Sequence, residues 1–217
     1  MRAMNSLSQF FDDLRMVIRF RFSAIGHYKY SLFCLLFLLL PAAFYYANPK
    51  LIKVFSGPVY AYAYFYLALL LQLSIYATVF SRQLFHRLTY QLWWCMFSFL
   101  SLFFFISSFA IVFQAVQFYD GAVLVQLFSI TAMCLGLSAV SKRSLLTVVI
   151  QWILAFFLFF FIQVVLLSIA LNIGVVDKKA YPKLAEELTN MIFNSSDQSF
   201  DHSIPVSYTH LTLPTKA

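Results

Sequence analysis

The sequence predicts an all-α fold, a polytopic membrane helix bundle of five transmembrane helices preceded by an N-terminal amphipathic interfacial helix. Two observations predict it. Of the 217 residues, 62% are hydrophobic and only 11% are charged, which leaves too few polar residues to cover the surface of a soluble fold. The apolar residues also gather in continuous runs, several of which reach the roughly 20 residues that a helix needs to cross a bilayer.

The first predicted element is an amphipathic helix around residues 10–22, FFDDLRMVIRFRF, within a cytoplasmic segment 1–29. A cleaved signal peptide would place its apolar region earlier and follow it with a small-residue cleavage site. We therefore expect a helix in the membrane interface with its arginines at the headgroups, or, as the alternative, a helix packed on the cytoplasmic end of the bundle. Its apolar residues recur at three- and four-residue spacing: Leu7, Phe10, Phe11, Leu14, Val17 and Ile18.

The predicted transmembrane domain covers residues 30–176. The first and fourth spans are barely long enough to cross, whereas the third and fifth should tilt or project into water. The alternating stretch PVYAYAYFY at 58–66 would suit a barrel strand, but its apolar run continues to Phe80, which favours a helix. The five spans are Tyr30–Ala47, Pro58–Phe80, Gln91–Phe118, Ala122–Val140 and Leu145–Val176.

The distribution of basic residues predicts the orientation. The N-terminal segment and the second and fourth loops carry more Lys and Arg than the opposite side, so the N-terminus should be cytoplasmic and the C-terminus outside, in a membrane that we expect to be the bacterial inner (plasma) membrane. The net charge of +7 does not indicate nucleic-acid binding, because these residues lie singly or in pairs between apolar runs. The basic residues on the predicted cytoplasmic side are Arg2, Arg15, Arg19, Arg21, Lys29, Arg82, Arg87, Lys142 and Arg143.

Two further segments follow the spans. Residues 177–205 are expected to form an external tail with a short helix at 181–193, YPKLAEELTNMIF, in which an apolar stripe recurs. The last residues, 206–217, change character abruptly. They resemble translated sequencing-adapter sequence and are expected to be non-native, so they are left out of the fold prediction.

The sequence predicts no catalytic residue, no cofactor and no metal site, and therefore no enzyme. The centres of all five spans lack ionisable residues, which intramembrane chemistry and ion coupling usually need. Asp12 and Asp13 diverge by about 100° on a helix, so we expect solvated residues rather than a metal pair. His27 and His86 flank spans. The three cysteines, expected to be packing residues, are Cys34, Cys95 and Cys134.

Two groups of residues are candidate sites. Small residues on one face of the fourth span, which allow close helix approach, predict a tight contact within the bundle or between subunits: Ser129, Ala132, Gly136 and Ala139. A polar cluster is predicted where the third and fourth spans meet, either as a polar vestibule or as interhelical hydrogen bonding: Gln114, Gln117 and Gln126.

The layout of residues 1–176, a cytoplasmic amphipathic segment followed by five closely spaced spans, resembles the Yip-type family of small five-span integral membrane proteins. The resemblance rests on span number and orientation. It implies a non-enzymatic role in membrane organisation or trafficking through contacts with partners. The expected partners are the lipid bilayer and either other membrane proteins or further copies of the chain. We therefore expect a non-catalytic scaffold or subunit of a membrane complex. The alternatives are a transporter or channel subunit that uses the glutamines, and a lipid-modifying enzyme that uses Asp12, Asp13 or His86.

Overall fold

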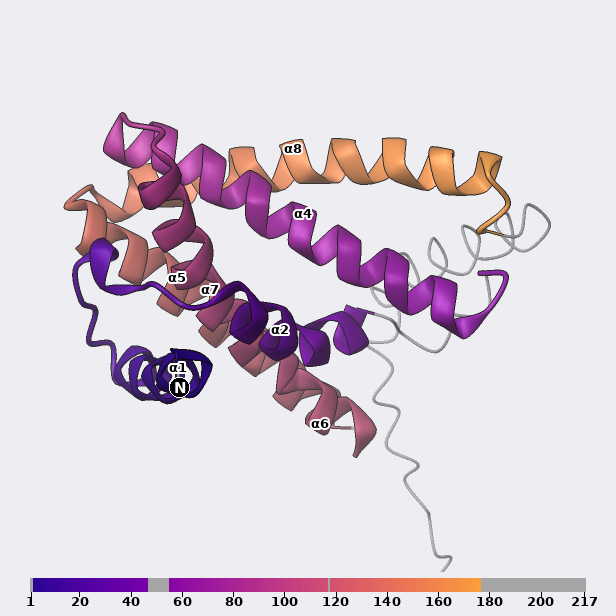
Figure 1. The fold of residues 1–217 in the computed structure, drawn as a ribbon, viewed down its shortest axis with the longest axis horizontal. Coiled ribbons are helices and arrows are strands. Elements are labelled where there is room, and N and C mark those ends of the chain that lie inside the picture. Colours follow the sequence, from indigo (N-terminus) through magenta and orange to yellow (C-terminus); the bar gives the residue numbers. More distant parts are fainter. Residues whose placement is uncertain (1, 47–54, 117, 177–217) are drawn as a thin grey trace, which may run out of the picture.

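The computed structural model describes residues 2–46, 55–116 and 118–176, and within them every regular element is a helix (Figure 1). The all-α prediction is therefore confirmed for this part of the chain. The expected external tail and the segment 206–217 lie outside the described residues. The elements are α1 (Arg2–Ile18), the short 3-10 helix η1 (Ile25–His27), α2 (Leu32–Tyr46), α4 (Pro58–Phe85), α5 (Tyr90–Ser108), α6 (Ala110–Ala115), α7 (Tyr119–Ser141) and α8 (Leu145–Asn172).

Four helical stretches of the described chain are long and apolar enough to cross a membrane: α4, α5 continued into α6, α7 and α8. The first predicted span instead forms α2, a shorter apolar helix. The 15 described residues of α2 rise about 22 Å, less than a bilayer core of about 30 Å, and the residues that follow Tyr46 lie outside the described part of the chain. The residues ahead of Leu32 do not extend it, because they are tied to α1: the Ser31 amide donates to Ser6 Oγ at 2.8 Å.

Helix α5 lies at the centre of the bundle. It packs against α2, α4 and α7, and α8 packs on the outside against α4 and α7. Almost every side chain of α5 from Cys95 to Ser108 is buried, whereas α8 buries only Val148, Ala155 and Ala170. Figure 1 shows the consequence: α4 and α8 run alongside each other and extend beyond the remaining helices at one end.

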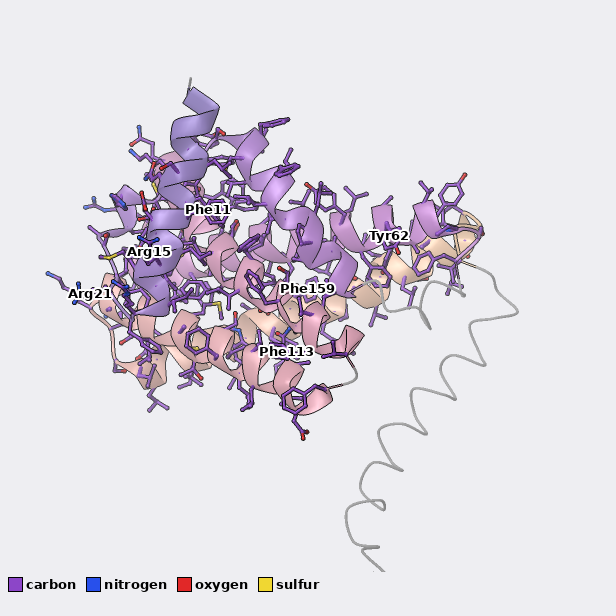
Figure 2. The ribbon with its side chains drawn as sticks, turned by 90° about the horizontal axis from the view of Figure 1, so that it is seen from below. Phe11, Arg15, Arg21, Tyr62, Phe113 and Phe159 are labelled. Atoms are coloured by element: carbon purple, nitrogen blue, oxygen red, sulfur yellow. The ribbon has the colours of Figure 1, made fainter. Side chains whose placement is uncertain are left out.

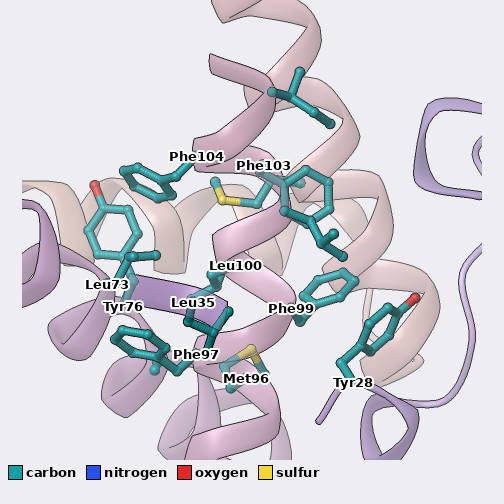
Figure 3. Packing of buried hydrophobic residues seen from close by; sticks show 14 of the residues in the cluster. Tyr28, Leu35, Leu73, Tyr76, Met96, Phe97, Phe99, Leu100, Phe103 and Phe104 are labelled. Atoms are coloured by element: carbon teal, nitrogen blue, oxygen red, sulfur yellow. The ribbon is translucent and has the colours of Figure 1, made fainter. Parts of the chain in front are cut away.

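Aromatic and aliphatic side chains of α5 form the centre of the core, and Leu35 of α2 and Leu73 and Tyr76 of α4 pack around them (Figure 3). Phe99 and Phe103 are fully buried, and their ring centroids lie 5.0 Å apart in an edge-to-face arrangement. Tyr28, from the chain between α1 and α2, lies against Phe99 at 4.8 Å. Such aromatic pairs add roughly 0.5–1.5 kcal/mol each beyond the area they bury, so the core also fixes where the N-terminal segment lies.

The third predicted span is interrupted at Phe109, between α5 and α6. The Phe109 amide bonds to the carbonyl of Ile106, three residues back, which is a tight turn rather than an α-helical bond. Two serines precede the break, and Ser108 Oγ donates to the Phe105 carbonyl at 2.6 Å. The Ser108 bond closes on a carbonyl three residues back, within the same tight turn, so the helix is interrupted here although the apolar pattern is continuous.

Helix α1 crosses the bundle rather than running along it. In Figure 1 it is seen nearly end-on while α4 and α8 run across the view, and it contacts α2, α5 and α7. Phe10, Leu14 and Val17 of the predicted apolar stripe are buried against the bundle. The rest of the stripe, namely Leu7, Phe11 and Ile18, is exposed.

Candidate functional site

A cavity of about 340 Å³ lies among α4, α5, α7 and α8. Each of the four helices contributes to its wall, so the site exists only when the bundle is assembled. Apolar side chains make up most of the wall, and a few neutral polar groups interrupt it. The lining residues are Phe65, Ala68, Leu69, Gln72 and Tyr76 of α4, Phe103, Phe104 and Ser107 of α5, Gln126, Ser129, Ile130 and Met133 of α7, and Trp152, Phe156, Phe159 and Gln163 of α8.

Three glutamines from three different helices meet at this cavity. Gln126 Nε2 donates to the Ser107 carbonyl at 3.3 Å, and Gln72 Nε2 donates weakly to the Tyr76 hydroxyl at 3.4 Å. Gln163 Oε1 accepts from the Tyr64 hydroxyl at 3.2 Å. Its Nε2 atom is buried and has no hydrogen-bond partner among the described residues, although a buried amide group in a protein usually has one.

The predicted glutamine cluster is assembled differently from the expectation. Gln126 lies at the cavity, but Gln117 lies outside the described residues, and the structure describes Gln114 only as a backbone position in α6. The glutamines that accompany Gln126 are Gln72 and Gln163, from the second and fifth predicted spans. The only signal in the sequence is that each interrupts an apolar run, and nothing there shows that their helices turn them toward one point.

The small-residue face of α7 is used inside the bundle. Ser129, Ala132 and Gly136 are buried, and Ala139 is exposed. A Cβ atom at Gly136 would come within 2.8 Å of both the Phe22 and the Phe99 rings. The missing side chain therefore makes room for two aromatic rings rather than for another helix backbone.

Two serines join α5 to α7 on this face. Ser107 Oγ donates to Ser129 Oγ at 2.9 Å, and Ser129 Oγ donates to the Phe103 carbonyl at 2.7 Å. Both serines also line the cavity. Their hydroxyl protons are thus committed to holding the two helices together, in a setting where such bonds contribute on the order of 0.6 kcal/mol each.

A second polar group ties α1 to the chain that leads into α2, and it corrects the expectation that both aspartates are solvated. Asp12 is exposed, but Asp13 is only 6% exposed. Its carboxylate accepts from the Tyr30 hydroxyl at 2.7 Å and pairs with His27 Nε2 at 2.9 Å. Burying the aspartate is tolerable because both carboxylate oxygens have a partner.

Neighbouring groups reinforce this attachment of α1. Gln9 Nε2 donates to the His27 carbonyl at 3.0 Å, and the Ser23 amide donates to the Tyr28 hydroxyl at 3.1 Å. Burial is the main reason that the pKa of Tyr28 is raised above its usual value. Asp13 and His86, two residues of the alternative lipid-modifying site, do not come together. Asp13 contacts His27, whereas His86 contacts Arg143, just after α7.

The described part of the chain contains no group of three or more His, Cys, Asp or Glu side chains that could hold a metal ion. The three cysteines are buried and unpaired, and two of them lie in the core cluster. No protein-family model, curated protein or solved structure matches the chain.

Proposed function

We propose that the chain is a non-catalytic multi-pass membrane protein that serves as a scaffold or subunit of a membrane complex. The observation that carries the proposal is the surface of α8. This helix has 28 residues and buries three of them, while Phe157 is 62% exposed and Phe161 is 68% exposed. Exposing so large a continuous apolar surface to water is unfavourable, so lipid or another membrane protein must cover it.

The proposed topology has five spans, with α2 as the short first one, the N-terminus in the cytoplasm and the C-terminus outside a bacterial inner membrane. Contacts at the two ends of the bundle support it. His86, after α4, meets Arg143, before α8, while Ser56 Oγ, before α4, donates to the Gly174 carbonyl, after α8, at 2.7 Å. Helices α4 and α8 thus run in opposite directions, which agrees with their places as the second and fifth of five proposed spans.

The charge distribution supports the same orientation. Figure 2 shows Arg15 and Arg21 at the end of the molecule opposite Tyr62. The basic residues of two short loops, Arg87 and Arg143, belong to the arginine-bearing end in the proposed topology, as the positive-inside rule requires of the cytoplasmic side. The tyrosines at the start of α4 would then lie in the opposite membrane interface.

Site-specific photo-crosslinking in intact cell membranes tests the scaffold role. A photo-crosslinking amino acid would replace Phe161 on α8 and, in a separate variant, Phe33, which is 74% exposed on α2. Reproducible protein adducts at one of these positions, with a fixed partner or a second copy, are the expected result. Adducts to lipid alone at both positions would contradict the proposal.

A transporter or channel subunit is the second candidate, and the meeting of three glutamines at one cavity favours it. Amide groups can replace part of the hydration of a polar solute in a pathway through the bundle. Flux of a solute into vesicles that contain the purified chain, reduced by Gln126→Leu, would be its signature. Absence of flux for cationic, anionic and neutral solutes alike would remove this candidate.

A further inference from the structure

We propose that the cavity among α4, α5, α7 and α8 binds a neutral, membrane-soluble molecule with an aromatic ring body and a carbonyl group that accepts a hydrogen bond. The binding site and its ligand class go beyond the scaffold role and do not depend on it. The cavity volume of about 340 Å³ lies within the range of roughly 300–1,000 Å³ that small-molecule sites occupy.

The walls determine the body of the ligand. Aromatic rings project from α4, α5 and α8 around the same space, and Figure 2 shows Phe159 among the helices. Flat apolar rings stack or meet edge to face with such side chains, which an extended aliphatic chain does less well. The aromatic lining residues are Phe65, Tyr76, Phe103, Phe104, Trp152, Phe156 and Phe159.

The polar groups of the lining determine the charge of the ligand. Among the described residues that line the cavity, the polar ones are glutamines, serines, a tyrosine and a tryptophan, all of them neutral. A charged ligand would lose its hydration without gaining an opposite charge, at a cost of several kcal/mol. A neutral molecule with one or a few polar atoms avoids this cost and also dissolves in the bilayer through which it must arrive.

The free donor determines the functional group. Tyr64 holds Gln163 Oε1 at 3.2 Å, which orients the amide and leaves Nε2 buried without a partner. A carbonyl oxygen supplies the acceptor that this nitrogen lacks. Two other donors in the described lining, Gln126 Nε2 and Ser129 Oγ, already bond to backbone carbonyls, whereas Gln163 Nε2 is a fully buried donor without a partner. Gln163 is therefore the group that recognises the ligand carbonyl.

Photolabelling with benzophenone tests the inference, because this compound has two rings, one carbonyl and no charge, and it reacts with nearby C–H bonds under light. The full chain would be purified in lipid nanodiscs, labelled over a concentration series and analysed by peptide mass spectrometry. Diphenylmethane, which has the same rings without the carbonyl, serves as the comparison competitor. We expect saturable adducts on cavity-lining residues. With deuterated benzophenone as the probe, diphenylmethane should compete more weakly than unlabelled benzophenone does.

Two variants make the test specific. Gln163→Leu should raise the half-saturation concentration about fivefold, the effect of losing one hydrogen bond, and it should fold because leucine suits an apolar wall. Gln91→Leu is the matched control at an exposed glutamine and should change nothing. Ala68→Phe fills the cavity and should abolish saturable labelling.

Two results would overturn the inference. One is labelling that is confined to exposed residues of α8 and never saturates. The other is saturable labelling of the cavity that is the same in Gln163→Leu as in Gln91→Leu, since Gln163 would then not recognise the carbonyl. Neither result depends on crosslinking to a partner protein, so this inference and the scaffold role fail separately.

Discussion

Replacing Tyr30 with phenylalanine should loosen α1 from the bundle without unfolding the rest. The hydroxyl donates to Asp13 at 2.7 Å, and both residues are buried, at 2% and 6% exposure. A hydrogen bond to a charged group contributes about 1.5–3 kcal/mol, and its loss leaves the carboxylate with His27 alone. The opening free energy of α1 should fall by this amount, which corresponds to an opening equilibrium about ten- to hundredfold larger.

Hydrogen–deuterium exchange measures this effect directly. Under conditions where exchange reports the opening equilibrium, peptides from α1 of Tyr30→Phe should exchange about ten- to hundredfold faster, while peptides from α8 keep their rates. Tyr90→Phe is the control, because Tyr90 is 77% exposed and stacks on Trp94. Equal exchange of α1 in the two variants would refute the view that the buried Asp13 contact holds this helix in place.

Three further predictions concern packing. Gly136→Leu should lower the stability in detergent by about 1–3 kcal/mol, because the new side chain would overpack against two rings. Ala139→Leu, on the exposed part of the same face, should leave the melting temperature nearly unchanged. A larger loss of stability in Ala139→Leu than in Gly136→Leu would show that the α7 face is wrongly placed. Phe99→Ala should lower the stability by about 3 kcal/mol, near the lower end of the usual range, because burial away from lipid gains no hydrophobic free energy and only packing is lost. Phe161→Ala should change the stability little. Thermal unfolding in nanodiscs compares the two variants. A maleimide should label the native chain slowly and the denatured chain fully, and rapid native labelling would contradict the burial of Cys34, Cys95 and Cys134.

Periodicity and apolar run length predict most of the helices, because membrane segments have to satisfy their own backbone hydrogen bonds. The ends and breaks depend on finer interactions. The second predicted span ends at Phe80, but α4 continues to Phe85 because Leu84 packs inward while Arg82 reaches outward from the same turn. The break at Phe109 is a tight turn in which the Phe109 amide bonds to the Ile106 carbonyl, and the continuous apolar pattern contains no sign of it.

The site depends on how the helices are rotated about their axes, which a single sequence specifies poorly. Gln72, Gln126 and Gln163 each stand alone in an apolar run, and only the packing of three helices brings them together. Asp13 shows the same limit. Its position on the helix suggests a solvent-exposed face, but the chain after α1 folds back through η1 and supplies His27 and Tyr30 as partners for the carboxylate.

The unequal lengths of α2 and α8 have a consequence for the surrounding lipid. Within the described residues α2 has 15 residues and α8 has 28, which correspond to rises of about 22 Å and 42 Å, and α4 packs against both helices. Acyl chains beside α2 would have to compress, while those beside α8 would have to stretch unless that helix leans. The lipid around the protein would then be thinner beside α2 than beside α8. Two copies would lower the energy of this lipid deformation by placing their α2 faces together.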